Sequence, residues 1–364
     1  MLQSKLITGI IGLRLALSCA LTARAAELAR FQVAEPLGMT WVDEWLTQEI
    51  SLKLGNATIK GSDLSLTGNG QPLPAQFHAR DGKLLSPDQQ LRGDVAVTVL
   101  YKATIKSKQR AEFTVTSDAR DGTAASVMTI TRDGQTLRIA NGVHELTFDQ
   151  AAPLPVNRIT AAGGKESLGA FAWPRGVVAA GVVDQLLESG PVRVVLRRSF
   201  SFTNPAHRYA ITFDMRLGDP WIDITDEYAL GKGTAITLDL RGMKPDTVYH
   251  PYAYNARTFS PGGSEEDSTL QPPQHPIATL GPIWRDIWYN GGPFAFVYNA
   301  KSPSGLGVVA HSGSDWTAPS HVSLESQNLE LHGDGEKPGQ VTLRIPTDAG
   351  HRRWALVVLP TDQR

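Results

Sequence analysis

The stretch of sequence that decides the fold covers residues 192–240 and reads VRVVLRRSFSFTNPAHRYAITFDMRLGDPWIDITDEYALGKGTAITLDL. Apolar and polar residues alternate through it with a period of two, which is typical of strands with one buried face. Three turn sequences divide it: TNPAH at 203–207, GDP at 218–220 and GKG at 231–233. The pattern predicts four consecutive antiparallel strands, because these turns leave no room for helical crossovers.

Short alternating stretches continue on both sides of this segment. Upstream, the hairpin dipeptides Asp133-Gly134 and Asn141-Gly142 separate three candidate strands between residues 127 and 148. Downstream, five further strands are expected between residues 294 and 359. No stretch from residue 120 onward shows the spacing of a helix of ordinary length. We therefore predict a large antiparallel β-sandwich over residues 124–364.

A smaller β-sandwich module is expected in front of it, over residues 27–118. Five candidate strands lie there, the first over residues 50–54 and the last ending at Thr116, and polar segments join them. The run SDARDGT at 117–123 is rich in turn residues and is the best linker candidate. The predicted fold class is therefore all-β, with a small β-sandwich preceding a large one.

The first 25 residues have the composition of a secretory signal peptide. Lys5 supplies a positive charge, residues 6–21 are mostly apolar, and Ala23-Arg24-Ala25 offers small residues at the positions that signal peptidase reads. Cleavage before Ala26 predicts a bacterial-type periplasmic or secreted protein. A membrane anchor is the alternative, but Arg14 leaves the apolar run short of the roughly 20 residues that a spanning helix needs. Stable membrane insertion is therefore not expected.

Cleavage would also change the chemistry available to the chain. A lipoprotein lipidated at Cys19 is a further alternative, although Ala16 stands where a Leu is expected. Cys19 is the only cysteine, so the cleaved protein would have no disulfide, no cysteine nucleophile and no cysteine-ligated metal. The remaining 32 basic and 36 acidic residues make no field that attracts nucleic acid. No phosphate-binding loop or dinucleotide fingerprint occurs, and we expect no cofactor.

The first candidate site cluster is HPYAYNAR at 250–257. His250 or Tyr254 would transfer a proton and Arg257 would neutralise a carboxylate. Tyr252 and Asn255 would bind hydroxyl groups of the same substrate. These residue types suit a sugar or uronic acid site. Alternatively, the tyrosines pack in the interior and the polar residues cap a loop.

A second cluster, WRDIWYN at 284–290, places neighbouring Arg and Asp residues between two tryptophans. The indoles of Trp284 and Trp288 would stack on a sugar ring while Arg285 and Asp286 bind its hydroxyl groups. Both tryptophans could equally belong to the core.

A third cluster, HSGSDWTAPSH at 311–321, would contribute His311 and Trp316 to the same cleft. It could also be a surface turn held by Ser and Asp side chains. It lacks the spacing of a zinc site and of a serine hydrolase elbow, so no metal is predicted.

Asp226 conflicts with the alternation, because it falls on the predicted core side of its strand with Ile222 and Ile224. A buried carboxylate is unfavourable unless it is paired. Either a bulge shifts the register, or Asp226 pairs with an arginine such as Arg197 or Arg216. We favour these structural explanations over a catalytic role.

Several stretches carry a resemblance to a known fold family. They are LRIANGV at 137–143 leading into LTF at 146–148, ESGPVR at 188–193, and the strands at 209–215 and 221–224. With these stretches, residues 135–364 resemble the galactose mutarotase-like supersandwich of polysaccharide lyases, glycosidases and aldose epimerases. EPLG at 35–38 and QPLPAQ at 71–76 look like the β modules that precede such domains in exported carbohydrate-active proteins. Epimerases of this family use histidines and a late Glu around the sugar ring.

Two functions follow as hypotheses. The first is an exported protein that binds or acts on a glycan in polysaccharide recognition or degradation; as an enzyme it would be a lyase, glycosidase or epimerase. Lyases of related architecture often take their base from a helical toroid, and no such domain is predicted here. The second is a non-enzymatic structural or protein-interaction β-sandwich of the cell envelope, with buried tryptophans and an exposed apolar patch. The sequence leaves the oligomeric state open.

Overall fold

The computed structural model describes residues 26–117, 128–240, 242–249, 274–276, 283–284, 294–299, 301, 304–311, 330–333 and 341–360. Most of these residues lie in β-strands, and the one helical element among them is a single 3₁₀ turn, η1 (Gly61–Asp63). The all-β fold predicted from the alternation is therefore confirmed. A search of the described residues finds no helix with the length and apolar character needed to span a membrane.

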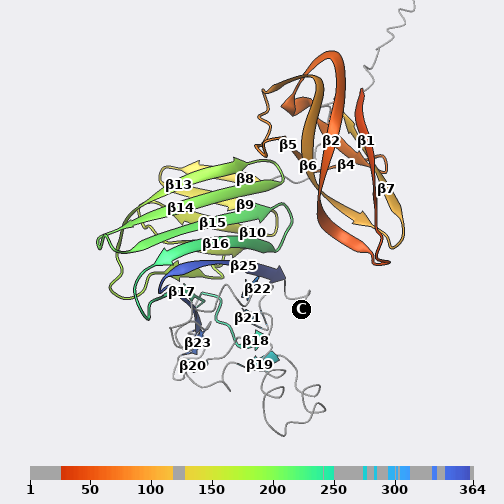
Figure 1. The fold of residues 1–364 in the computed structure, drawn as a ribbon. Coiled ribbons are helices and arrows are strands. Elements are labelled where there is room, and N and C mark those ends of the chain that lie inside the picture. The colour runs from red at the N-terminus through yellow and green to blue at the C-terminus, as the bar shows by residue number, and fades with distance from the viewer. Residues whose placement is uncertain are drawn as a thin grey trace, which may run out of the picture.

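Residues 27–116 form two antiparallel sheets around a hydrophobic core of their own, drawn in red to orange in Figure 1. The rings of Phe31, Tyr101 and Phe113 lie 4.9–5.9 Å apart in this core. One sheet has the strand order β1-β7-β3-β4 and the other β2-β6-β5. The strands are β1 (Glu27–Ala34), β2 (Trp41–Lys60), β3 (Ser65–Gly68), β4 (Gln71–Leu73), β5 (Ala75–Ala79), β6 (Gln90–Ile105) and β7 (Arg110–Thr116).

β2 is much longer than the strand expected from Ile50 to Leu54. It spans 20 residues and pairs with β6 along most of its length. The ladder is interrupted between Lys53 and Thr58, where Gly55 has a φ of 56°. This irregularity breaks the alternation in the sequence without ending the strand, because pairing resumes beyond it.

The second part of the chain is built on a long sheet of nine antiparallel strands, in the order β13-β14-β15-β16-β25-β22-β21-β18-β19. Figure 1 shows β13 to β16 and β25 side by side. The strands are β13 (Ala179–Ser189), β14 (Arg193–Phe202), β15 (Arg208–Arg216), β16 (Trp221–Ala229), β18 (Thr247–Tyr249), β19 (Gln274–Pro276), β21 (Phe294–Tyr298), β22 (Ser304–Ala310) and β25 (Gly350–Pro360).

The predicted four-strand meander is correct for β14, β15 and β16 and wrong for its fourth member. β17 (Ala235–Asp239) leaves the long sheet and joins a different one, and β25 takes the place beside β16. The turn before β17 contains Gly231 and Gly233, both with positive φ, which allows the chain to change direction there. The meander instead begins one strand earlier, at β13, whose two bulges disrupt its alternation.

Two smaller sheets cover the inner face of the long sheet. The ring centroid of Phe148, from one small sheet, lies 5.3 Å from that of Phe213 in the long sheet. The ring centroid of Phe171, from the other small sheet, lies 6.2 Å from that of Trp354, also in the long sheet, so all three sheets share one hydrophobic core. The strand orders are β11-β10-β9-β8 and β12-β17-β24-β23-β20. Their further strands are β8 (Thr129–Asp133), β9 (Thr136–Ala140), β10 (His144–Asp149), β11 (Arg158–Ala161), β12 (Ala170–Ala172), β20 (Ile283–Trp284), β23 (Glu330–Gly333) and β24 (Val341–Pro346).

Polar contacts join the first two sheets to the long sheet. Nε2 of His78 in β5 lies 3.0 Å from a carboxylate oxygen of Glu188 in β13. Oε1 of the buried Gln76 accepts the backbone N–H of Arg193 at 3.1 Å. There is no free space at this contact, because a Cβ added to Gly190 would lie 1.9 Å from Oε1 of Gln76.

We expect Gly190→Ala to lower the free energy of unfolding by about 1–3 kcal/mol, because the added methyl group overpacks a filled contact. Urea denaturation measures the change. In the Gln76→Ala background the same substitution should have little further effect, since the obstructing side chain is gone. Equal effects of Gly190→Ala in both backgrounds would contradict the close contact.

Candidate functional site

The long sheet presents a polar outer face on β14, β15 and β16, which His351 and Arg353 continue on β25. On β16 the side chains of Ile222, Ile224 and Asp226 are buried, and the residues between them point outward. From Trp221 to Glu227 this outward row is about 20 Å long, at about 3.3 Å per residue. The face is therefore longer than a single sugar ring.

Two carboxylates lie directly opposite each other on this face, Asp214 in β15 and Asp223 in β16. Like charges in this position are unfavourable unless cations compensate them. Arg193 donates two hydrogen bonds to Asp214, at 2.9 and 2.8 Å, and Nε2 of His311 lies 2.9 Å from Asp223. Arg216 approaches Asp214 and Asp223 to 3.8 and 3.9 Å. These five residues form the carboxylate cluster, whose side chains all remain partly accessible to solvent.

An exposed indole lies at the end of this cluster. Trp221 is 42% exposed, and it shares the outer face of β16 with Asp223, two residues further along. Its backbone N–H donates to Asp219 at 3.2 Å. Burial raises the pKa of Asp219. An apolar ring face beside carboxylates and a guanidinium is the combination that a sugar ring requires.

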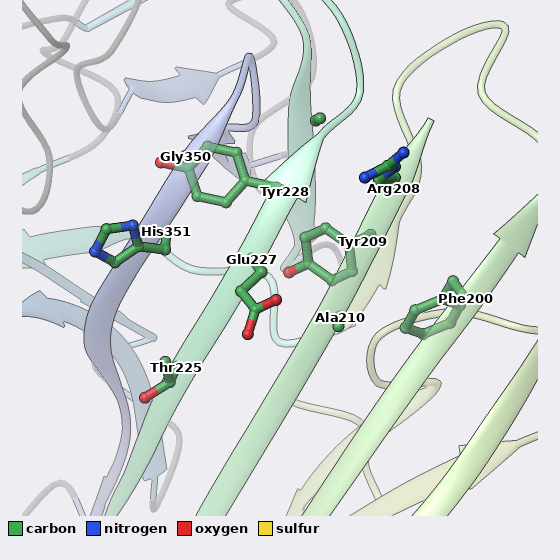
Figure 2. Close-up of a pocket in the computed structure, with 10 residues that line it drawn as sticks. Phe200, Arg208, Tyr209, Ala210, Thr225, Glu227, Tyr228, Gly350 and His351 are labelled. Carbon is green, nitrogen blue, oxygen red and sulfur yellow. The ribbon is translucent and has the colours of Figure 1, made fainter. Parts of the chain in front are cut away.

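A shallow hollow of about 560 Å³ lies toward the other end of the same strands (Figure 2). Ala210, Ala229 and Gly350 contribute little side-chain volume there. Glu227 stands directly opposite Ala210 on one side and His351 on the other. The full lining is Phe200, Arg208, Tyr209, Ala210, Thr225, Glu227, Tyr228, Ala229, Gly350 and His351.

A buried ion pair lies on the inner face of the same strands. Arg352 donates to both oxygens of the fully buried Asp226, at 3.0 and 2.8 Å. The Tyr209 hydroxyl and the Trp354 indole N–H donate to the same carboxylate, at 3.1 and 3.2 Å. Burial and the carboxylate raise the pKa of Tyr209 well above its ordinary value. Burial alone would lower the pKa of Arg352, but Asp226 raises it.

The prediction of a structural pair for Asp226 is thus confirmed, with a different partner. Arg197 and Arg216 lie on the outer face, whereas Arg352 is directly opposite Asp226 across the β16–β25 ladder. The ladder shows no register shift on either side of β16, so there is no bulge. This pair fixes the register that turns Asp223 and Glu227 outward.

The structure describes two of the eleven predicted site residues. His311 directly follows β22 and contacts Asp223. Trp284 is described by its backbone, which pairs with Leu331 in the five-stranded sheet. The remaining nine lie outside the described residues: His250, Tyr252, Tyr254, Asn255, Arg257, Arg285, Asp286, Trp288 and Trp316.

Sequence reasoning missed most of the outer face. The alternation in the sequence contained this information, because the residues between the core positions of β15, β16 and β25 all point to the outer face. Those overlooked are Arg208, Asp214, Trp221 and His351. Within the described ranges, no group of three or more His, Cys, Asp or Glu side chains is arranged to hold a metal ion.

Comparison with known proteins leaves the family open. No protein-family model and no curated protein matches this sequence. Among solved structures, a glycosyl hydrolase family 38 protein from Enterococcus faecalis is 9% identical with a TM-score of 0.47, covering 93% of this chain and 45% of its own. An alpha-mannosidase from Enterococcus faecalis V583 is 8% identical with a TM-score of 0.42, covering 91% and 43%. The YidC insertase is 9% identical with a TM-score of 0.33, covering 65% and 41%. This chain therefore spans less than half the length of each.

Proposed function

We propose that this protein binds a glycan along the outer face of the long sheet. The observation that carries the proposal is the exposed indole of Trp221 in line with Asp223 and beside Arg216. A sugar ring presents an apolar face for the indole and hydroxyl groups for the charged side chains. The length of the face favours an oligosaccharide or polysaccharide over a monosaccharide.

The carboxylate cluster would also provide groups for acid–base chemistry. Asp223 and His311 are in contact, and side chains of these two kinds can accept a proton from a hydroxyl group bound beside the pair. An enzyme with this site would act on a carbohydrate, as a lyase, glycosidase or epimerase. His250, Tyr254 and Arg257 remain proposed catalytic residues. We place the protein in the periplasm or outside the cell, after cleavage before Ala26.

Affinity electrophoresis through gels that contain neutral or acidic polysaccharides tests binding. The wild-type protein should be retarded, and Trp221→Ala should weaken the affinity about tenfold, which corresponds to about 1.4 kcal/mol for a lost stacking contact. Leu37→Ala removes an exposed apolar side chain from the first module and should leave retardation unchanged. A wild-type protein that no glycan retards would overturn the proposal.

A protein-interaction function has one observation in its favour. β13 is the edge strand of the long sheet, and Val183, Leu186 and Leu187 on it are exposed. Apolar side chains on an open edge favour pairing with another chain. Sedimentation velocity over a range of concentrations would show self-association, and Leu187→Lys should abolish it.

A further inference from the structure

The hollow in Figure 2 contains two polar side chains that the rest of the described chain leaves without partners. Arg208 lines it from β15 and His351 from β25, and both are exposed. Within the described residues, neither side chain makes a hydrogen bond or an ion pair. Their donor groups are therefore available to a ligand.

The charge balance of the hollow is positive. Its one carboxylate belongs to Glu227, which lies 3.4 Å from Arg197 on the same face. Because this contact compensates Glu227, the guanidinium of Arg208 remains as a positive charge that no described residue matches.

The space and the walls suit a substituted sugar ring. A volume of about 560 Å³ falls within the range of small-ligand sites. The small side chains of Ala210 and Ala229 leave room in the hollow, and Thr225 supplies a hydroxyl group. The hollow shares the outward row of β16 with Asp223 and Trp221, so one chain of sugars could reach both ends.

We propose that the hollow is a subsite for an anionic substituent of the bound glycan, either a uronic acid carboxylate or a sulfate ester. Arg208 binds two oxygens of the anion through its planar fork, and His351 donates a further hydrogen bond. The inference rests on the proposed function and narrows it to acidic glycans.

Isothermal titration calorimetry with three probes tests the subsite: a polyuronate, a sulfated glucan and an uncharged glucan. Arg208→Gln should weaken binding of the preferred acidic probe about 10- to 100-fold, the range for a lost hydrogen bond to a charged group. Arg208→Lys should restore part of the loss, since it keeps the charge without the fork. The acidic probe whose binding Arg208→Gln weakens identifies the anion as a carboxylate or a sulfate. Thermal unfolding of each variant confirms that it folds.

The control is Arg132→Gln, which removes an exposed arginine from β8. It should leave every affinity unchanged. Equal losses of affinity for Arg132→Gln and Arg208→Gln would show that only the net charge of the protein matters, and this result would overturn the subsite. Glycan binding that Arg208→Gln leaves intact would overturn the subsite while the proposed function stands. Failure of all three probes with the wild-type protein would overturn both.

Discussion

Replacing Arg352 with methionine should lower the free energy of unfolding by about 3–5 kcal/mol. The substitution leaves the Asp226 carboxylate fully buried without its cation, and among the described residues two neutral donors, Tyr209 and Trp354, remain bound to it. Urea denaturation followed by circular dichroism measures the change. Arg353→Met, one residue away on the exposed side of β25, should change stability by less than about 1 kcal/mol.

A double variant separates the buried charge from the lost packing. Asp226→Leu combined with Arg352→Met removes both charges and should recover much of the stability that Arg352→Met loses. A single Arg352→Met variant as stable as the wild-type protein would contradict the buried pair.

Lowering the pH from 7 to 4.5 should lower the free energy of unfolding by about 2–3 kcal/mol because of His144. Burial lowers the pKa of this imidazole to about 3, and neither ring nitrogen has a hydrogen-bond partner among the described residues. Below about pH 6.5 the unfolded chain gains a proton on this ring that the folded protein does not accept. Each pH unit between the two pKa values then lowers the free energy of unfolding by about 1.4 kcal/mol.

The measurement compares denaturation midpoints at several pH values. His144→Leu should remove this part of the acid sensitivity, whereas His351→Leu, which removes an exposed imidazole, should retain it. Parallel pH profiles for the wild-type protein and His144→Leu would show that His144 is protonated in the folded state as readily as in the unfolded state.

The sequence predicted which face of a strand is buried, but it did not predict which strands lie next to each other in the sheet. The buried faces of β14, β15 and β16 follow from residue spacing alone. The place of β17 does not, because a period of two specifies a buried face and leaves the neighbouring strand undetermined. For the same reason the partner of Asp226 could not be identified, since Arg352 lies 126 residues away in the sequence.

The candidate site shows the same division. His311 was predicted from its local cluster of polar residues, but its contact with Asp223 depends on the order of β16, β25 and β22 in the sheet. Trp221 was interpreted as the start of a strand. Its exposure at the end of the outer face became visible only when β16 was placed between β15 and β25.

The position of β25 between β16 and β22 has a consequence for how the protein is made. β16 leaves the ribosome more than a hundred residues before β25, and until β25 arrives its free edge has no strand to pair with and Asp226 has no cation. Non-local pairing of this kind slows folding and leaves an edge open to other chains. The central part of the long sheet can therefore complete its folding only after residue 360 has been synthesised.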